Sequence, residues 1–143
     1  MPLQRATLEN LDDLLELAEI WDNEEDNLEP TSADKLHKAI EEEIVFLFYE
    51  EEEEQLIGAM ICDENYTSMN LKTLYVHPDH RGEGIGKTML SSLTETLDKS
   101  AMSAFLEVDA HNPAIELYET FDFEVDDKIS TIDGHIAMTR EPQ

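Results

Sequence analysis

Three glycines within five residues mark the segment whose chemistry is clearest in the sequence. They are Gly82, Gly84 and Gly86, with Arg81 just before them and Lys87 just after them. Glycine accepts a positive φ and lets the backbone approach a ligand closely. A predicted strand ends before this segment and a predicted helix follows, so unpaired amides and the positive end of the helix dipole would meet there. The segment therefore predicts an anion site, to which the guanidinium of Arg81 adds a planar donor fork suited to phosphate.

Two other phosphate-binding patterns fit the same segment incompletely. A dinucleotide fingerprint requires G-x-G-x-x-G, and Met89 stands where its last glycine would be. A phosphate loop of the G-x-x-x-x-G-K-[ST] type ends correctly at Gly86, Lys87 and Thr88, but Arg81 replaces its first glycine. A nucleoside triphosphatase, which would bind ATP with magnesium, stays open as an alternative.

The charge of the chain limits the partners that the sequence favours. The 143 residues include 35 acidic and 9 basic side chains, for a formal charge of −26. Phosphate contact needs a basic face, so we expect neither nucleic acid nor an anionic membrane surface as a partner. A cationic small molecule or peptide as substrate is compatible with this acidity, and so is a solvated, salt-adapted surface.

The remaining composition predicts a cytoplasmic globular chain. Its one cysteine, Cys62, lies in a hydrophobic run and is expected to be a core residue. No apolar run approaches the ~20 residues of a membrane span, and the first residues lack the apolar stretch of a signal peptide. His77 and His80 are spaced like metal ligands, but Pro78 lies between them and no thiolate pair accompanies them, so no metal is expected.

Hydrophobic periodicity and turn residues place the elements around the glycine segment. Apolar residues at helical spacing predict helices over about 8–21, 32–43, 85–97 and 112–121. β-branched and aromatic runs predict strands over 2–6, 44–49, 56–62, 68–76, 103–108, 123–129 and 135–140. Thr7 and Asn112 are predicted N-caps, and the acidic segment 22–32 is expected to interrupt the helical pattern. We expect a single domain over residues 1–143.

At this point the residues resemble a known family. The strand 71–76, the segment 77–86 and the helix after it look like the acetyl-CoA site of the GNAT superfamily of N-acetyltransferases. The family's signature, [Q/R]-x-x-G-x-[G/A], is matched by Arg81, Gly84 and Gly86. The resemblance covers about residues 3–139.

A second motif strengthens the resemblance. In the run HNPAIELYETFDF, Asn112 and Tyr118 match an asparagine of the family and the tyrosine six positions after it. Phe123 matches the phenylalanine of a typical Gly-Phe pair, whereas Asp122 replaces the glycine. Aspartate tolerates a left-handed backbone better than most residues, so the helix end is expected to survive this change.

The resemblance implies a cofactor site and a fold. The residues it assigns to acetyl-CoA binding are Leu74, Tyr75, Val76, Arg81, Gly82, Glu83, Gly84, Ile85, Gly86, Lys87 and Asn112. Main-chain groups of Leu74 and Val76 would pair with the pantetheine arm, and the amides over 81–87 would hold the pyrophosphate. The implied fold is α/β, with a mixed, largely antiparallel central sheet and helices on both faces.

The resemblance also implies an N-acetyltransferase that moves acetyl directly from acetyl-CoA to a primary amine in a ternary complex. Tyr118 would stand near the sulfur and protonate the departing thiolate. Many relatives carry a glutamate where this chain has Lys72, so Glu107 is the expected base, with Asp109, Glu64 or a water relay as alternatives. A non-catalytic acyl-CoA-binding or regulatory module is the alternative function.

The acceptor itself stays open at this stage. The segment 22–32 and the strand 55–66 are expected to line its pocket, and their acidity is compatible with a cationic amine. A homodimer is possible, because folds of this kind often finish with an exposed C-terminal strand.

Overall fold

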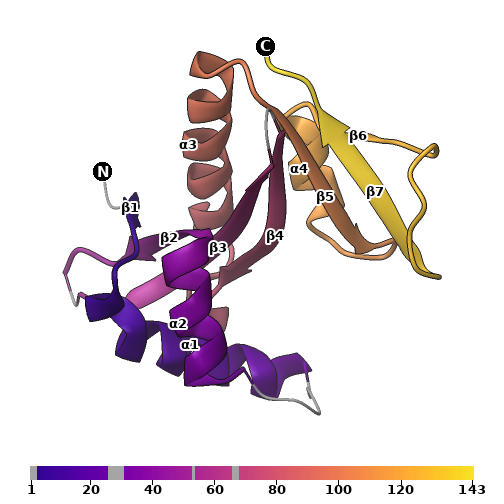
Figure 1. Ribbon diagram of the computed structural model, residues 1–143. Helices are drawn as coiled ribbons and strands as arrows, with labels where there is room; N and C mark the ends of the chain where they lie inside the picture. Colours follow the sequence, from indigo (N-terminus) through magenta and orange to yellow (C-terminus); the bar gives the residue numbers. More distant parts are fainter. Residues whose placement is uncertain (1–2, 26–30, 53, 66–67) are drawn as a thin grey trace. The chain divides into compact units, whose positions relative to one another are not determined.

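The computed structural model describes residues 3–25, 31–52, 54–65 and 68–143 (Figure 1). Its elements are β1 Leu3–Arg5, a 3-10 turn Leu8–Asn10, α1 Leu11–Glu25, α2 Ala33–Glu42, β2 Ile44–Tyr49, β3 Leu56–Asn65, β4 Ser68–Val76, a 3-10 turn Pro78–His80, α3 Ile85–Lys99, β5 Ser103–Asp109, α4 Ile115–Thr120, β6 Glu124–Val125 and β7 His135–Arg140. The strand order is β1-β2-β3-β4-β5-β7-β6. The recorded pairings are antiparallel except for β4 with β5, so the prediction of a mixed, largely antiparallel sheet is confirmed.

The contacts within the chain group into two compact units. The first contains Met1–Cys62 and Thr73–Met89, and the second contains Asp63–Lys72 and Leu90–Gln143. The division runs through β3, β4 and α3, which contribute residues to both units. The expectation of a single domain over residues 1–143 stays a prediction.

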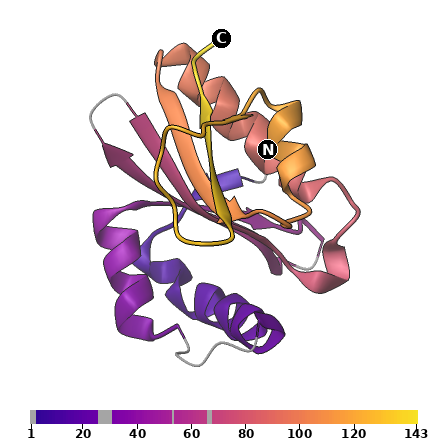
Figure 2. The same ribbon diagram turned by 90° about the vertical axis from the view of Figure 1, so that its right-hand side faces the viewer.

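In the first unit, helices contact both faces of the sheet. Val45, Leu47 and Ala59 point from β2 and β3 into a core that α1 and α2 complete with Leu14, Leu17 and Leu36. Figure 2 shows these two helices side by side. On the other face, a Cβ built on Gly58 would meet Met89 Sδ at 2.9 Å and Ile85 Cγ2 at 3.4 Å, so the first turns of α3 pack directly on β3.

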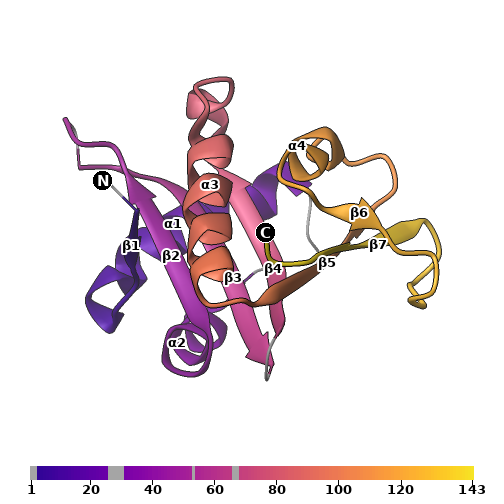
Figure 3. The same cartoon turned by 90° about the horizontal axis from the view of Figure 1, so that it is seen from above.

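In the second unit, β5 pairs with β7, and β7 pairs with β6 (Figure 3). Ala104 and Leu106 of β5 are buried, and so are Ala137, Met138 and Arg140 of β7. The buried Arg140 donates two hydrogen bonds to Asp98 of α3, at 2.8 and 3.1 Å, and one to the carbonyl of Phe121 at 2.7 Å. This arginine therefore ties the core face of β7 to α3 and to the end of α4.

Three boundaries differ from the sequence expectation. Thr7 caps a 3-10 turn, as a capping box with Asn10, and the α-helix begins only at Leu11. That helix continues to Glu25, because Asp22 finds partners within the fold: it accepts hydrogen bonds from the amide and hydroxyl of Thr31 at 2.7 and 3.1 Å. The strand expected over 123–129 is confined to Glu124–Val125, since Asp126 accepts from the amide of Lys128 and forms a local turn.

The helix after Asn112 also begins later than expected. Asn112 Oδ1 accepts a hydrogen bond from the Ala114 amide at 2.8 Å, and the Asn112 carbonyl accepts from the Ile115 amide at 3.2 Å. These bonds form a turn before the helix, and α4 starts at Ile115 with Ala114 as its N-cap. Asn112 therefore caps a turn two residues ahead of the helix rather than the helix itself.

Two other expectations concern the core and the membrane. Cys62 is fully buried, so the prediction of a core cysteine is confirmed, and desolvation raises the pKa of its thiol to about 12. Among the helices that the structure describes, none is both long and apolar enough to cross a bilayer.

Candidate active site

Gly82 and Gly84 both adopt the left-handed conformation that their spacing predicts. Each has a φ of +82°, and a Cβ built on either would meet nothing within 4 Å. The third glycine, Gly86, lies inside α3. The backbone thus turns at two glycines whose outer side is open to a ligand, and it enters a helix immediately afterwards.

The first turn of α3 presents main-chain donors to this open side. Thr88 donates from its amide and its hydroxyl to the carbonyl of Gly84, both at 3.0 Å, which closes the first helical turn. The amides of Ile85, Gly86 and Lys87 precede that bond and have no carbonyl acceptor within the helix. The Lys87 side chain is exposed on the same turn. The free amides, the positive end of the helix dipole and the Lys87 ammonium group together favour the binding of an anion at the start of α3.

Arg81 does not direct its fork toward an anion site. Its Nη1 and Nη2 donate to the two carboxylate oxygens of Glu24 at 2.7 and 2.6 Å, and its Nε donates to the Val76 carbonyl at 3.2 Å. Its Cζ also lies 5.4 Å from the ring centroid of Tyr75. The sequence suggested a phosphate ligand, whereas the structure shows a side chain that ties the loop to α1 and β4.

Aromatic residues extend this contact along α1. The Tyr75 hydroxyl donates to Glu24 Oε1 at 3.0 Å, and the Tyr75 ring stacks on Trp21 at a centroid distance of 5.5 Å. The hydrogen bond from Arg81 is the main reason that the pKa of Glu24 is lowered, and the same bond raises the pKa of Arg81. Sequence reasoning missed Glu24, because nothing in an acidic run distinguishes the one carboxylate that meets an arginine 57 residues later.

A histidine and two carboxylates border the glycine turn on another side. His80 Nδ1 lies 3.2 Å from Glu83 Oε1, and His80 Nε2 lies 3.6 Å from Glu50 Oε2. Glu83 is the one acidic residue between Gly82 and Gly84, so its charge opposes an anion in the turn. His80 thus lies between these two carboxylates at the border of the glycine turn.

The strand before the turn, β4, has neighbours β3 and β5 in the sheet. β4 pairs in parallel with β5 over Ser68–Asn70 and Ser103–Phe105, whereas β4 continues to Val76. Leu74 and Val76 lie beyond this recorded ladder. The Val76 carbonyl accepts from Arg81, as described above, and the following amide, of His77, donates to the Ile57 carbonyl at 2.8 Å.

In the second unit, Tyr118 is held by the end of α4. The Phe123 amide donates to the Tyr118 carbonyl at 3.2 Å, and the Asp122 amide donates to the Glu119 carbonyl at 3.1 Å, which is a Schellman motif. Asp122 has a φ of +70°, so it takes the left-handed position expected of it in place of glycine. The Tyr118 and Phe123 rings meet edge to face at 5.8 Å. Burial raises the pKa of the Tyr118 hydroxyl to about 12.

Glu107, the expected base, has a histidine partner. Glu107 Oε2 lies 3.1 Å from Nδ1 of His135, and both side chains are about one-third exposed. Asp109 Oδ1 instead accepts from the His111 amide at 2.8 Å and stabilises the turn after β5. The sequence did not predict the pairing of Glu107 with His135, because the register of β5 with β7 brings the two together from distant positions.

The expected site residues fall into two groups, one in each compact unit. The first unit contains Leu74, Tyr75, Val76 and the turn 81–87, and the second contains Glu107, Asn112 and Tyr118. Among the described residues, no group of three or more histidine, cysteine, aspartate and glutamate side chains is arranged to hold a metal ion.

Comparison with known proteins yields a family and a set of similar folds. Residues 17–140 match the model of the acetyltransferase (GNAT) domain. The human cysteine-rich protein 2-binding protein is 33% identical over 72 residues, which are 50% of this chain and 9% of that relative's length. The chain thus spans about a tenth of the curated relative that it matches.

Solved structures show the same fold at low identity. The PaiA N-acetyltransferase of Thermoplasma acidophilum, solved in complex with coenzyme A, has a TM-score of 0.77 and 21% identity over 99% of both chains. The ribosomal-protein-S18-alanine N-acetyltransferase of Escherichia coli has a TM-score of 0.78 and 21% identity, over 97% of this chain and 92% of that one. With the family match over most of its length, this chain belongs to the GNAT family of acetyltransferases.

Proposed function

We propose that this chain transfers acetyl from acetyl-CoA to a primary amine, directly and within a ternary complex. The observation that carries the proposal is the turn at Gly82 and Gly84, open on its outer side and followed by the unpaired amides of α3. The coenzyme A complex of the similar PaiA enzyme supports the choice of cosubstrate. The diphosphate would be bound by main-chain donors and by Lys87, with Arg81 holding the turn in shape.

The transfer needs an acid for the leaving group. As the amine nitrogen attacks the thioester carbon, the C–S bond breaks, and the thiolate takes a proton from a positioned donor. Tyr118 is suited to this role, because burial raises the pKa of its hydroxyl to about 12 and so keeps the hydroxyl protonated near neutral pH. Its ring packs against Phe123, so the hydroxyl is presented from a fixed side chain.

The transfer also needs a base for the amine. A lysine-like amine has a pKa of about 10.4, so a group must accept its proton near neutral pH. We assign this role to Glu107, whose carboxylate is partly exposed and lies against His135 at 3.1 Å. The proton lost by the amine would pass to Glu107, and His135 would orient that carboxylate.

The experiment is a turnover assay with a matched variant. Purified protein, acetyl-CoA and a panel of primary amines are incubated, and the release of free thiol is followed. We expect turnover with at least one amine, and we expect Tyr118→Phe to lower kcat at least tenfold, the usual effect of removing a positioned proton donor. The phenylalanine keeps the ring contact, so an unchanged melting temperature would show that the loss is chemical.

The same assay separates the enzyme from a non-catalytic acyl-CoA-binding module. Binding of acetyl-CoA without turnover of any amine would favour the module and contradict the proposal. Turnover that is unchanged in Tyr118→Phe would remove Tyr118 from the mechanism and leave the acetyltransferase activity in place.

A further inference from the structure

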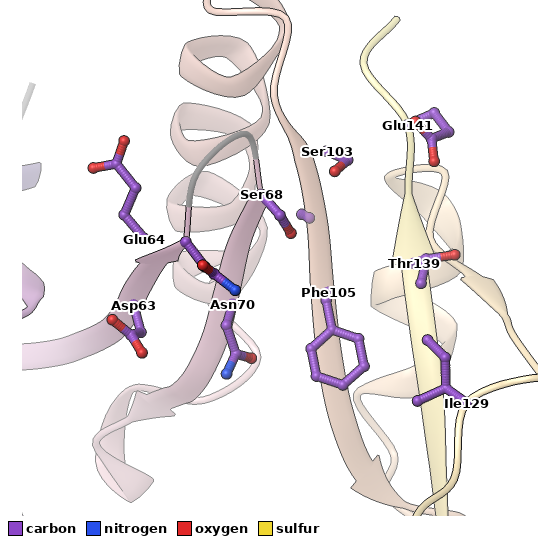
Figure 4. Close-up of a pocket in the computed structure, with 11 residues that line it drawn as sticks. Asp63, Glu64, Ser68, Asn70, Ser103, Phe105, Ile129, Thr139 and Glu141 are labelled. Atoms are coloured by element: carbon purple, nitrogen blue, oxygen red, sulfur yellow. The ribbon is translucent and has the colours of Figure 1, made fainter.

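A cavity of about 570 Å³ lies in the second unit, on β3, β4, β5 and β7 (Figure 4). We name it the β-face pocket. Residues that define it include Asp63, Asn70, Ser103, Phe105, Thr139 and Glu141. Its volume is in the range of small-molecule sites.

Strand register explains how the pocket is formed. Asn70 is paired with Phe105, and Phe105 with Thr139, so one row of side chains crosses three strands on the same face. Neighbouring β5 residues Ala104 and Leu106 are buried on the opposite face. That opposite face is the one on which Arg140, the partner of Ala104, reaches α3 and α4. The β-face pocket therefore lies on the face of the sheet away from these helices.

All charged side chains that line the pocket are acidic. Asp63 and Glu64 lie on one side of it and Glu141 on the other, with the Phe105 ring between them (Figure 4). The lining contains no lysine or arginine; Lys72, two residues beyond Asn70 on β4, projects on the same face but lies outside the lining. In the described part of the chain, no hydrogen bond or ion pair is recorded for the carboxylates of Asp63, Glu64 and Glu141. The pocket thus complements a cation, and the Phe105 ring can contact its methylene groups or its charge.

The face of β5 that lines the pocket also carries the proposed base, Glu107. Residues i and i+2 of a strand share a face, so Glu107 projects on the same face as Ser103 and Phe105. With a rise of about 3.3 Å per residue, Glu107 lies about 7 Å along β5 from Phe105 and about 13 Å from Ser103. One ligand of that length can reach both the pocket and Glu107.

We propose that the acceptor is a linear diamine or longer polyamine, with one amine at Glu107 and a second, protonated amine in the β-face pocket. The proposal rests on the acetyl transfer proposed above and names its substrate class. Two protonated amines separated by about 7–13 Å match the spacing between Glu107 and the pocket rows. The carboxylates of the pocket hold the distal charge, and the proximal amine loses its proton to Glu107.

The test compares 1,7-diaminoheptane with n-heptylamine, which has the same chain and lacks the second charge. We expect a KM for the diamine at least tenfold below that for the monoamine. In the double variant Asp63→Asn with Glu141→Gln, the KM for the diamine should rise about tenfold, roughly threefold for each charge removed. The kcat and the KM for heptylamine should change less than twofold. Glu116→Gln, an exposed acid on α4, is the control and should change neither constant.

Calorimetry of 1,7-diaminoheptane with the protein alone gives a readout independent of turnover. Weaker binding to the double variant than to Glu116→Gln supports the pocket, even if no amine is acetylated and the proposed reaction fails. Equal binding to both variants overturns the inference, as does the absence of binding to the unmodified protein. Acetylation of both amines with equal KM also overturns it, while the proposed acetyltransferase activity would stand.

Discussion

At the glycine turn, the main chain and one side chain have separate tasks. The amides at the start of α3 remain available to an anion, whereas Arg81 is engaged by Glu24, by the Val76 carbonyl and by the Tyr75 ring. Glu24 is thus the residue that fixes the position of Arg81. The contribution of Glu24 to the stability of the fold depends on its negative charge and therefore on pH.

Glu24→Gln should lower the free energy of unfolding by at most about 1 kcal/mol at pH 7, because the pair is largely exposed and screened by solvent. The pKa of Glu24 in the folded chain is below its ordinary 4.5, so the pair stabilises the fold above that pH. The contribution is lost as the pH falls through the lowered pKa. Urea unfolding at pH 7 and pH 3 measures the difference between the variant and the unmodified protein.

The matched control is Glu19→Gln, an exposed acid on the same helix. It should not change stability at either pH. A Glu24→Gln difference that is equal at pH 7 and pH 3 would show that the carboxylate charge does not hold Arg81, against this description of the turn.

At the scale of single residues, the sequence predicts the backbone conformation wherever residue type and position in a motif determine it. The positive φ of Gly82, Gly84 and Asp122 follows from residue type and motif position. The sequence does not predict the partners of Arg81 and Glu107. Those partners, Glu24 and His135, come from distant segments that only tertiary packing brings together. Acidic residues are so frequent in this chain that composition alone does not distinguish the paired ones.

At the scale of elements, Gly58 sets how closely α3 approaches β3. A Cβ at this position would lie 2.9 Å from Met89 Sδ and 3.3 Å from Phe48 Cβ. The thioether is flexible and can move, whereas the Phe48 Cβ is fixed to its strand. The glycine therefore permits a contact that brings the start of α3, and with it the anion site, against the sheet.

Gly58→Ala should lower the free energy of unfolding by about 1–3 kcal/mol, and Gly58→Val should lower it further, since added volume strains a packed interface. Thermal or urea unfolding monitored by circular dichroism measures both. If neither variant loses stability, the close contact between β3 and α3 is not required for the fold.

The sequence predicts helices and strands where the hydrophobic pattern is strong, and it predicts the ends of these elements less well. The strands over 44–49 and 103–108 match β2 and nearly match β5, because β-branched and aromatic runs rarely form anything else. The ends of α1, α4 and β6 depended on side-chain hydrogen bonds of Asp22, Asn112 and Asp126. Such local bonds compete with regular structure and leave little trace in periodicity.

For the whole molecule, the charge of −26 has opposite effects on the binding of the two ligands of the proposed reaction. A cationic acceptor is attracted by the general field, whereas an anionic cosubstrate must bind against it. Binding of a diphosphate therefore requires a local site strong enough to overcome that field. The family resemblance indicated the position of this site from sequence, while the β-face pocket became visible only through the register of β4, β5 and β7.

Hydrogen exchange over the whole chain, with and without coenzyme A, tests the central claim that main-chain amides after Val76 bind the diphosphate. Amides within 82–88 should exchange at least tenfold more slowly with coenzyme A, and pantetheine, which lacks the diphosphate, should leave them unchanged. Exchange of these amides that does not respond to saturating coenzyme A, or responds equally to pantetheine, would contradict the account.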